Sequence, residues 1–152
     1  MKNLTTSGVQ PFIFSEPSPY ILLESVHDIL KYLDYDIIMK GEHAFLNRQE
    51  VSFDNQSDLS PEMKQCYANG LLITGLLEQL SNDEYDKVEQ QFEKLLETVS
   101  NLIQRKLEAK KLNSSHCVFI HKDDIGDIVI GFMKKNDWKE YNDETGYLKL
   151  CS

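Results

Sequence analysis

The chain has 152 residues, which is enough for one domain to bury a hydrophobic core without disulfides or a structural metal. Its hydrophobic content of 41% is that of an ordinary globular protein, and no run approaches the roughly 20 apolar residues of a membrane span, so we expect no membrane insertion. The net charge of −9 opposes binding to the phosphates of nucleic acid, which we therefore do not expect as a partner.

The N-terminus and the cysteines favour a reducing compartment. Residues 1–15 contain Lys2 but no continuous apolar segment and no small-residue cleavage site, so we expect no secretory signal and a cytoplasmic location. Cys66, Cys117 and Cys151 are odd in number and widely spaced, with no Cys-x-x-Cys motif. They are predicted to be reduced, partly buried thiols.

The chain is predicted to begin with a flexible polar segment at 1–10 and a short apolar run at 11–14, which suits a strand or a docked arm. Ser18 as N-cap and Pro19 in the first helical position then predict a helix that ends near Asp34. Its apolar residues are expected on one stripe: Leu22, Leu23, Val26, Ile29, Leu30 and Leu33.

A hairpin and a second helix are predicted next. Residues 35–40 and 44–53 have the pattern of two strands around the turn Gly41-Glu42. Ser60 followed by proline predicts a helix start, and apolar residues continue in helical spacing to 80. Within this span Asn69-Gly70 is also a turn signal, so the helix over 61–80 is expected either to kink there or to admit a neighbouring backbone closely.

The strongest periodicity belongs to a helix predicted over 82–112. Ser81 and Glu84 form a capping box at its start. The apolar seam follows alternating steps of three and four: Tyr85, Val88, Phe92, Leu95, Val99 and Leu102. Because this seam demands a partner surface, we expect the helix to pack antiparallel on the 61–80 helix as a helical hairpin, or on its symmetry mate in a dimer.

The C-terminal part changes to strand periodicity. Residues 116–121 and 127–133 predict a second hairpin, and 147–151 a final short strand. Helices and hairpins are therefore segregated along the chain. This order predicts a single α+β domain over 1–152, in which an antiparallel sheet from two hairpins packs with the N-terminal helix and the long helical hairpin.

No metal or cofactor site is predicted. His116, Cys117 and His121 lie close in sequence, but on a strand Cys117 and His121 would stand about 13 Å apart and His116 would point the other way. A zinc ion needs its ligands at about 2.0 to 2.3 Å. The acidic loop at 123–127 lacks the alternating oxygen ligands and terminal Glu of an EF-hand loop, so it is interpreted as a solvated turn.

No catalytic residues are predicted either. Ser25 and His27 are close in sequence but about 200° apart on a helix, and no nucleophile elbow, His-Glu-x-x-His pair or phosphate-binding glycine loop is present. We therefore expect a protein that is not an enzyme. An enzyme or ligand sensor that uses a pocket between the helical hairpin and the sheet remains an alternative.

The leading hypothesis is a small acidic protein that binds a basic protein partner, for instance as an inhibitor, an immunity-type protein, a phage anti-defence protein or an adaptor. Its support is the net charge of −9, concentrated at residues 16–60 where nine acidic residues face three basic ones, and aromatic residues set among charges. The residues expected to contact this partner are Asp34, Asp36, Glu42, Glu50, Trp138 and Tyr141. A lone tryptophan that closes the edge of a sheet is the competing interpretation of Trp138.

The second hypothesis is a homodimeric structural or assembly protein in which the 82–112 helix pairs with its copy. The residues expected at that interface are Phe92, Leu95, Val99 and Leu102. If the seam is instead the core of one protomer, charged replacements there would destroy the fold rather than separate two folded protomers.

Overall fold

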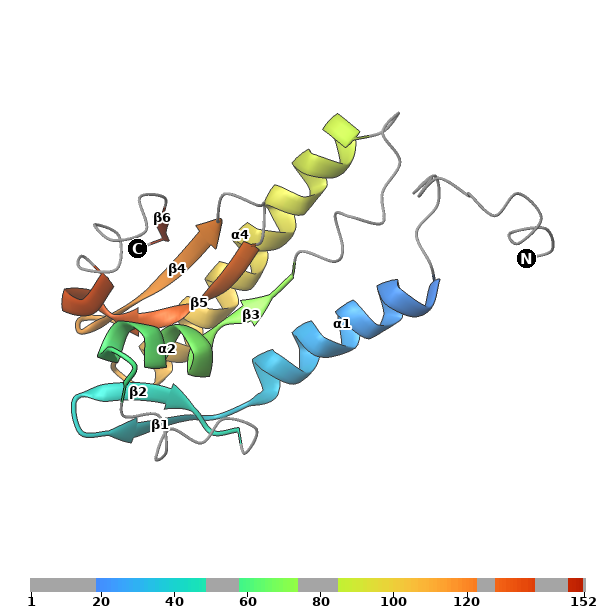
Figure 1. The fold of residues 1–152 in the computed structure, drawn as a ribbon. Coiled ribbons are helices and arrows are strands. Elements are labelled where there is room, and N and C mark those ends of the chain that lie inside the picture. The colour runs from blue at the N-terminus through green and yellow to red at the C-terminus, as the bar shows by residue number, and fades with distance from the viewer. Residues whose placement is uncertain (1–18, 49–57, 74–84, 123–127, 139–147, 152) are drawn as a thin grey trace, which may run out of the picture.

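The structure is a computed structural model that describes residues 19–48, 58–73, 85–122, 128–138 and 148–151. The α+β class with antiparallel sheets is confirmed. In chain order the elements are α1 (Pro19–Asp34), β1 (Ile37–Lys40), β2 (His43–Leu46), α2 (Pro61–Asn69), β3 (Leu71–Leu72), α4 (Tyr85–Ala109), β4 (His116–Lys122), β5 (Ile128–Lys134) and β6 (Leu148–Cys151) (Figure 1). A helical turn at 135–138 follows β5.

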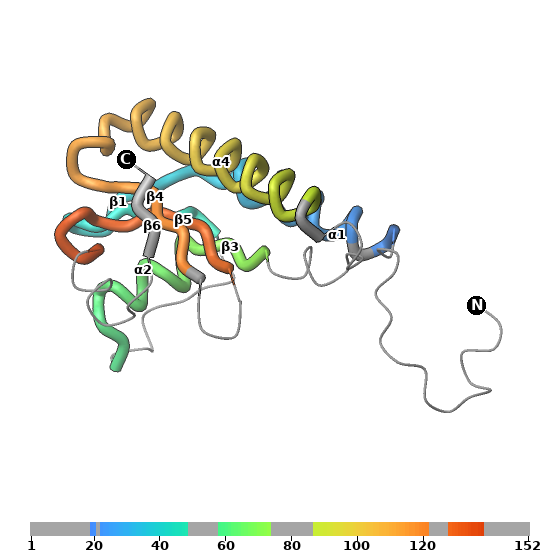
Figure 2. The backbone as a smooth tube through the Cα atoms, turned by 90° about the horizontal axis from the view of Figure 1, so that it is seen from above, coloured from blue at the N-terminus to red at the C-terminus, as the bar shows by residue number. Residues whose placement is uncertain are grey.

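The larger sheet has four strands in the order β3-β5-β4-β6, and all neighbours run antiparallel. The two long strands pair along their whole length, from His116 opposite Lys134 to Lys122 opposite Ile128. The predicted second hairpin and final strand are therefore confirmed. In Figure 2 this sheet lies between α4 on one side and α2 on the other.

Both faces of this sheet are buried, because strand alternation divides its apolar residues between two layers. On the α4 side lie Val118, Ile120, Ile130 and Phe132, within the main core. On the α2 side Cys117, Phe119 and Met133 pack with Trp138, Met63 and Cys66. A sheet covered on both faces explains why β4 and β5 are apolar runs rather than alternating sequences.

The buried face of α4 packs against this sheet. Phe92, Leu96, Val99, Ile103 and Leu107 are buried in the main core with the inward residues of β4 and β5. The predicted helical hairpin is not confirmed, because within the described residues the partner of α4 is the sheet. A broad sheet accommodates a long helix as well as a second helix does, and the seam alone does not distinguish the two.

Helix α2 begins as predicted and ends early. Ser60 is its N-cap, with the Met63 amide donating to Ser60 Oγ at 3.3 Å, and Pro61 is its first residue. The prediction of one continuous helix over 61–80 is wrong at Gly70, where the backbone is extended and the chain enters β3. Residues 74–80 lie outside the described part of the chain. The turn signal at Asn69-Gly70 thus outweighs the apolar periodicity that continues beyond it.

The β1–β2 hairpin forms a separate two-stranded sheet around Gly41-Glu42, with Gly41 at φ 65°. Such a left-handed position favours glycine. The hairpin packs on α2 and β5 rather than joining the larger sheet through backbone hydrogen bonds. It closes the end of the main core with Ile37, Ala44 and Leu46.

The C-terminal half of α1 is anchored to the rest of the molecule. Ile29 and Tyr32 are buried in the main core, and the Lys106 ammonium on α4 donates to the carbonyls of Leu33 and Tyr35. A cation is favourable at these carbonyls because they carry the negative end of the α1 dipole. Burial lowers the pKa of Lys106 from its ordinary value.

Several expectations concern residues outside the described part of the chain: the flexible start at 1–10, the apolar run at 11–14, the caps at Ser18 and Ser81, the extension of the first hairpin to 53, and the acidic loop at 123–127. Among the described helices, none combines the length and apolarity required to cross a bilayer.

Candidate functional site

Of the acidic residues expected to contact a partner, Asp34, Asp36 and Glu42 lie in the described part of the chain. Asp34 is exposed at the end of α1. Asp36 forms an ion pair with Lys110 at 2.9 Å, and this hydrogen bond lowers the pKa of Asp36. Glu42 is paired in the same way with Lys134 at 2.5 Å, which lowers the pKa of Glu42 and raises that of Lys134. Two of the expected contacts therefore already have partners within the chain.

Of the aromatic residues in that prediction, Trp138 lies in the described part of the chain and is largely buried. Trp138 is 7% exposed, and its ring centroid lies 5.5 Å from that of Phe119 beneath the larger sheet. Trp138 thus packs on a residue of the inner strand β4, and its burial leaves little of the ring for a partner. Glu50 and Tyr141 lie outside the described residues.

The residues expected at a dimer interface lie mainly inside one protomer. Phe92 and Val99 are buried in the main core, Leu95 packs against it half-buried, and Leu102 is partly exposed. A dimer through this seam stays a prediction. Its apolar face is already occupied by the sheet of the same chain.

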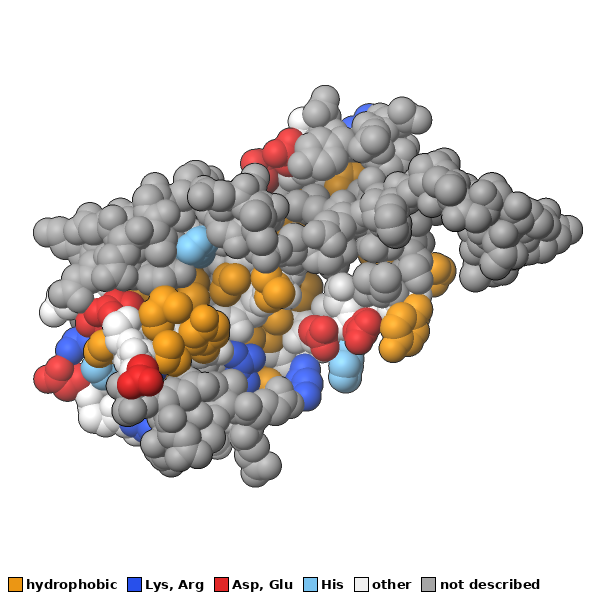
Figure 3. All heavy atoms as spheres, in the orientation of Figure 1, with side chains coloured by type: hydrophobic (Ala, Val, Ile, Leu, Met, Phe, Trp, Pro, Cys, Tyr) orange, Lys and Arg blue, Asp and Glu red, His pale blue; other side chains and the backbone are white. Residues whose placement is uncertain are grey.

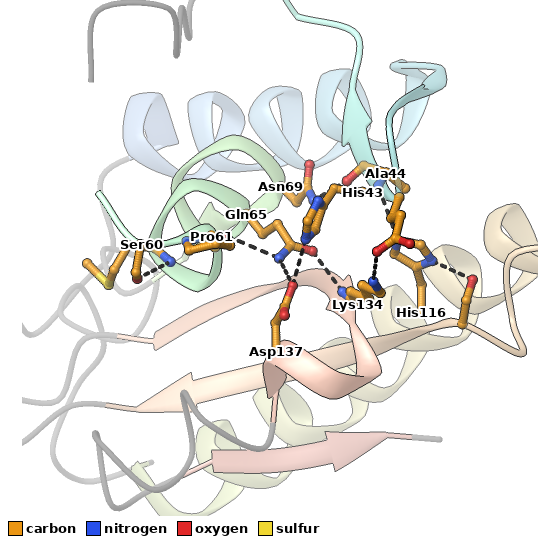
Figure 4. A network of polar contacts seen from close by, with 12 residues as sticks. His43, Ala44, Ser60, Pro61, Gln65, Asn69, His116, Lys134 and Asp137 are labelled. Carbon is orange, nitrogen blue, oxygen red and sulfur yellow. Dashed lines mark hydrogen bonds and ion pairs between the residues drawn. The ribbon is translucent and has the colours of Figure 1, made fainter. Parts of the chain in front are cut away.

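A network of polar side chains joins the β1–β2 hairpin to the rest of the molecule (Figure 4). We call it the hairpin junction and define it by His43, Gln65, Asn69, His116, Lys134 and Asp137. It brings together residues from β2, α2, β4, β5 and the turn at 135–138. No sequence motif indicated it, because its members are separated by up to 94 positions.

Asn69 lies at the centre of the hairpin junction and is fully buried. Its Oδ1 accepts from the Leu46 amide at 2.9 Å, and its Nδ2 donates to the Ala44 carbonyl at 2.9 Å and to the Phe132 carbonyl at 3.1 Å. The carboxamide thus pairs with the outer edge of β2 as a neighbouring strand would. An otherwise bare strand edge is covered by one side chain.

Gln65 and Asp137 extend the junction on the α2 side. Gln65 Nε2 donates to Asp137 Oδ2 at 2.6 Å and to the Pro61 carbonyl at 3.1 Å, while its Oε1 accepts from the Lys134 amide at 2.8 Å. His43 Nε2 lies 2.9 Å from the same Asp137 oxygen. These bonds connect the hairpin turn, α2 and the end of β5.

The His43–Asp137 pair resembles in its geometry the base and orienting carboxylate of an acid–base site. Within the described residues, however, no hydroxyl, thiol or amine is hydrogen-bonded to His43. No three described His, Cys, Asp or Glu side chains are grouped so as to hold a metal. The hydrogen bonds of the junction join the hairpin, α2 and the end of β5, as a structural clamp does.

Helix α1 carries the other notable feature, an apolar surface that the described part of the chain leaves exposed. Tyr20 is 73% exposed, Leu23 71%, Val26 49% and Leu30 61%. We call these four residues the α1 outer face. Figure 3 shows hydrophobic side chains along this helix beside acidic ones. Large apolar side chains gathered on one exposed surface are typical of binding sites.

The structure divides the apolar stripe predicted on α1. Leu23, Val26 and Leu30 are exposed, whereas Ile29 is buried. At 100° per residue, Ile29 lies about 120° around the helix from Leu23. This angle already indicates that the apolar stripe is too wide to be buried by a single packing surface.

Comparison with protein-family models, with curated proteins and with solved structures gave no match for this chain.

Proposed function

We propose that this protein acts by binding another protein, and that the α1 outer face is its contact surface. The observation that carries the proposal is the exposure of Tyr20, Leu23, Val26 and Leu30 on one helix whose opposite side is anchored in the core. Because this helix is already folded and anchored, its backbone loses little conformational entropy when a partner binds. Amphipathic helices commonly dock in apolar grooves of their partners.

The charges around this surface favour a basic partner. Glu24, Asp28 and Asp34 on α1 are exposed, against one lysine, Lys31. The Lys31 ammonium lies 6.0 Å from the centroid of the ring of Tyr35, the residue that directly follows α1. With the chain's net charge of −9, this balance would speed association with a positively charged surface and make it sensitive to salt. Inhibition of a basic enzyme or toxin is one activity that such a binder could have.

Leu23 and Leu30 are expected to contribute most to binding. Complete burial of a leucine side chain stabilises a complex by roughly 1.5 to 3 kcal/mol, of which part is offset by the cost of association. The two leucines lie two helical turns apart and within about 20° of each other around the axis. They therefore form the centre of the α1 outer face, where interface hot spots concentrate.

The test compares three forms of the protein in affinity capture from a source-cell lysate at low and at moderate salt. The binding variant is Leu23→Ser/Leu30→Ser. The matched control is Met39→Ser/Tyr67→Ser, which removes two other exposed apolar side chains, on β1 and α2. A basic protein retained by the natural form and the control, but lost from the binding variant, is then purified and titrated calorimetrically against all three.

We expect the dissociation constant to rise at least tenfold for the binding variant and less than twofold for the control. Charge reversal by Glu24→Lys/Asp34→Lys should slow association, most strongly at low salt. Equal retention of every captured protein by the binding variant and the natural form would contradict the proposal.

A further inference from the structure

His116 is a buried titratable group that the proposed function does not use. It begins β4, is 1% exposed, and lies where the β1–β2 hairpin meets the larger sheet. Its Nε2 accepts a hydrogen bond from the Ala44 amide at 3.1 Å. On the opposite side of the ring, Nδ1 lies 2.8 Å from Ser115 Oγ.

These contacts define one protonation state of the ring. A backbone amide can only donate, so Nε2 must be unprotonated. Ser115 Oγ also lies 3.2 Å from the Leu112 carbonyl and donates its proton there, which leaves the oxygen to accept from Nδ1. His116 is therefore neutral with the proton on Nδ1. A second proton would place Nε2–H against the Ala44 N–H, two donors facing each other in a buried site.

The surrounding charges also disfavour that second proton. His43 from β2 and Lys134 from β5 face His116 and oppose a positive charge on its ring, whereas Asp137 from the turn at 135–138 favours one. Glu42 of the hairpin turn is engaged by Lys134. Burial, and after it His43 and Lys134, lowers the pKa of His116 from its ordinary value of 6.5, although Asp137 acts in the opposite direction.

We propose that His116 is an acid-sensitive latch: its neutral ring holds β2 of the hairpin against β4, and its protonation favours local opening of the hairpin while the four-stranded sheet stays folded. The β1–β2 hairpin suits such opening because, among the residues that the structure describes, no backbone hydrogen bond connects it to the larger sheet. It is held by side chains of the hairpin junction and by packing. This inference does not depend on the proposed function.

The direction of the effect follows from proton linkage. The opened hairpin exposes His116 to water and returns its pKa toward 6.5, so the open form binds protons more readily than the closed form. Above pH 6.5 the His116 latch makes its full contribution to the stability of the closed hairpin. Below it, opening should increase by up to tenfold for each pH unit, until His116 is protonated in the closed form as well.

The experiment measures amide hydrogen exchange by NMR between pH 8 and pH 5, with each rate divided by the intrinsic rate at that pH. We expect the protection of Ala44 and Leu46 to fall by up to tenfold per unit below pH 6.5, while Phe119 and Ile130 in the large sheet keep theirs. His116→Gln offers a non-titrating acceptor in place of Nε2 and should abolish the fall. His43→Gln makes the same change at the neighbouring imidazole and should retain it.

A second measurement keeps the latch testable if His116→Gln does not fold. Imidazole ¹⁵N shifts of the natural protein at pH 8 should show His116 as the Nδ1–H tautomer. An Nε2–H tautomer, protection of Ala44 that does not change with pH, or an acid response that persists in His116→Gln would each overturn the proposal.

Discussion

The hairpin junction and the α1 outer face differ in how their side chains are satisfied. In the junction, polar groups are buried and their hydrogen bonds are made within the chain, as with the three side-chain bonds of Asn69. On the outer face, apolar groups such as Leu23 and Leu30 remain in water. The first arrangement specifies one packing, because each unmade bond would be costly. The apolar side chains of the outer face would be buried only in a complex with a partner. Substitutions in the junction should therefore change stability, and substitutions on the outer face should change binding.

The largest expected loss of stability comes from Asn69→Asp. The substitution keeps the shape of the side chain but replaces the donor to the Ala44 and Phe132 carbonyls with an acceptor, in a fully buried site. We expect the free energy of unfolding to fall by about 4 kcal/mol or more, a large part of the roughly 5 to 15 kcal/mol typical of a domain. Urea denaturation measures this loss. Asn47→Asp, an exposed control, should change it little, and a comparable effect of both would show that the junction is not special.

Gly131→Ala should destabilise the protein by overpacking. A Cβ at Gly131 would lie 2.4 Å from the Asn69 carbonyl oxygen and 3.0 Å from the Phe119 ring, so β5 and the end of α2 must separate. Overpacking of this kind costs about 1 to 3 kcal/mol. Gly41→Asn is the matched control, because Asn tolerates a positive φ and no atom lies within 4 Å of a Cβ there. A midpoint of urea unfolding that shifts equally in both variants would contradict the close approach.

Tyr32→Phe tests the connection between the two regions. The buried Tyr32 hydroxyl donates to the Asn69 carbonyl at 2.5 Å and so ties α1 to the hairpin junction. Burial raises the pKa of Tyr32 above its ordinary value, so the phenol stays a donor into alkaline solution. Loss of this bond leaves the carbonyl unpaired and should cost about 1 to 2 kcal/mol in thermal or urea unfolding. Tyr20→Phe on the outer face should cost nothing measurable; equal effects would mean that α1 is not fixed through this bond.

Local signals predicted most of the elements. The α1 boundaries at Pro19 and Asp34, the start of α2 at Ser60 and the β4–β5 hairpin each depend on a cap, a proline or a change of period within a few residues. The end of α2 was missed because apolar residues beyond Gly70 continue in helical spacing. The partner of α4 was missed because a seam of apolar residues indicates burial without indicating what buries it.

The site could not be predicted in the same way, since its contacts join distant parts of the chain. Ala44 and His116 are 72 positions apart, as are Gln65 and Asp137, and no local pattern links them. Glu42 was expected to be a free acid for a partner, but Lys134, 92 positions away, pairs with it. Net charge is a property of the whole sequence, whereas the availability of each charge is decided by the fold.

The smallest expected effect on stability is that of Leu30→Ala, and its sharpest comparison is with the neighbouring residue of α1, Ile29. Ile29 is 8% exposed and Leu30 61%, so the two side chains lie on opposite sides of the boundary between core and outer face. Ile29→Ala should lower the free energy of unfolding by about 2 to 4 kcal/mol, whereas Leu30→Ala should change it by no more than about 0.5 kcal/mol. Partner binding should show the reverse order, with the larger loss for Leu30→Ala. If Leu30→Ala instead destabilises the isolated protein as much as Ile29→Ala does, the outer face is already packed in the free chain, and the surface proposed for binding does not exist.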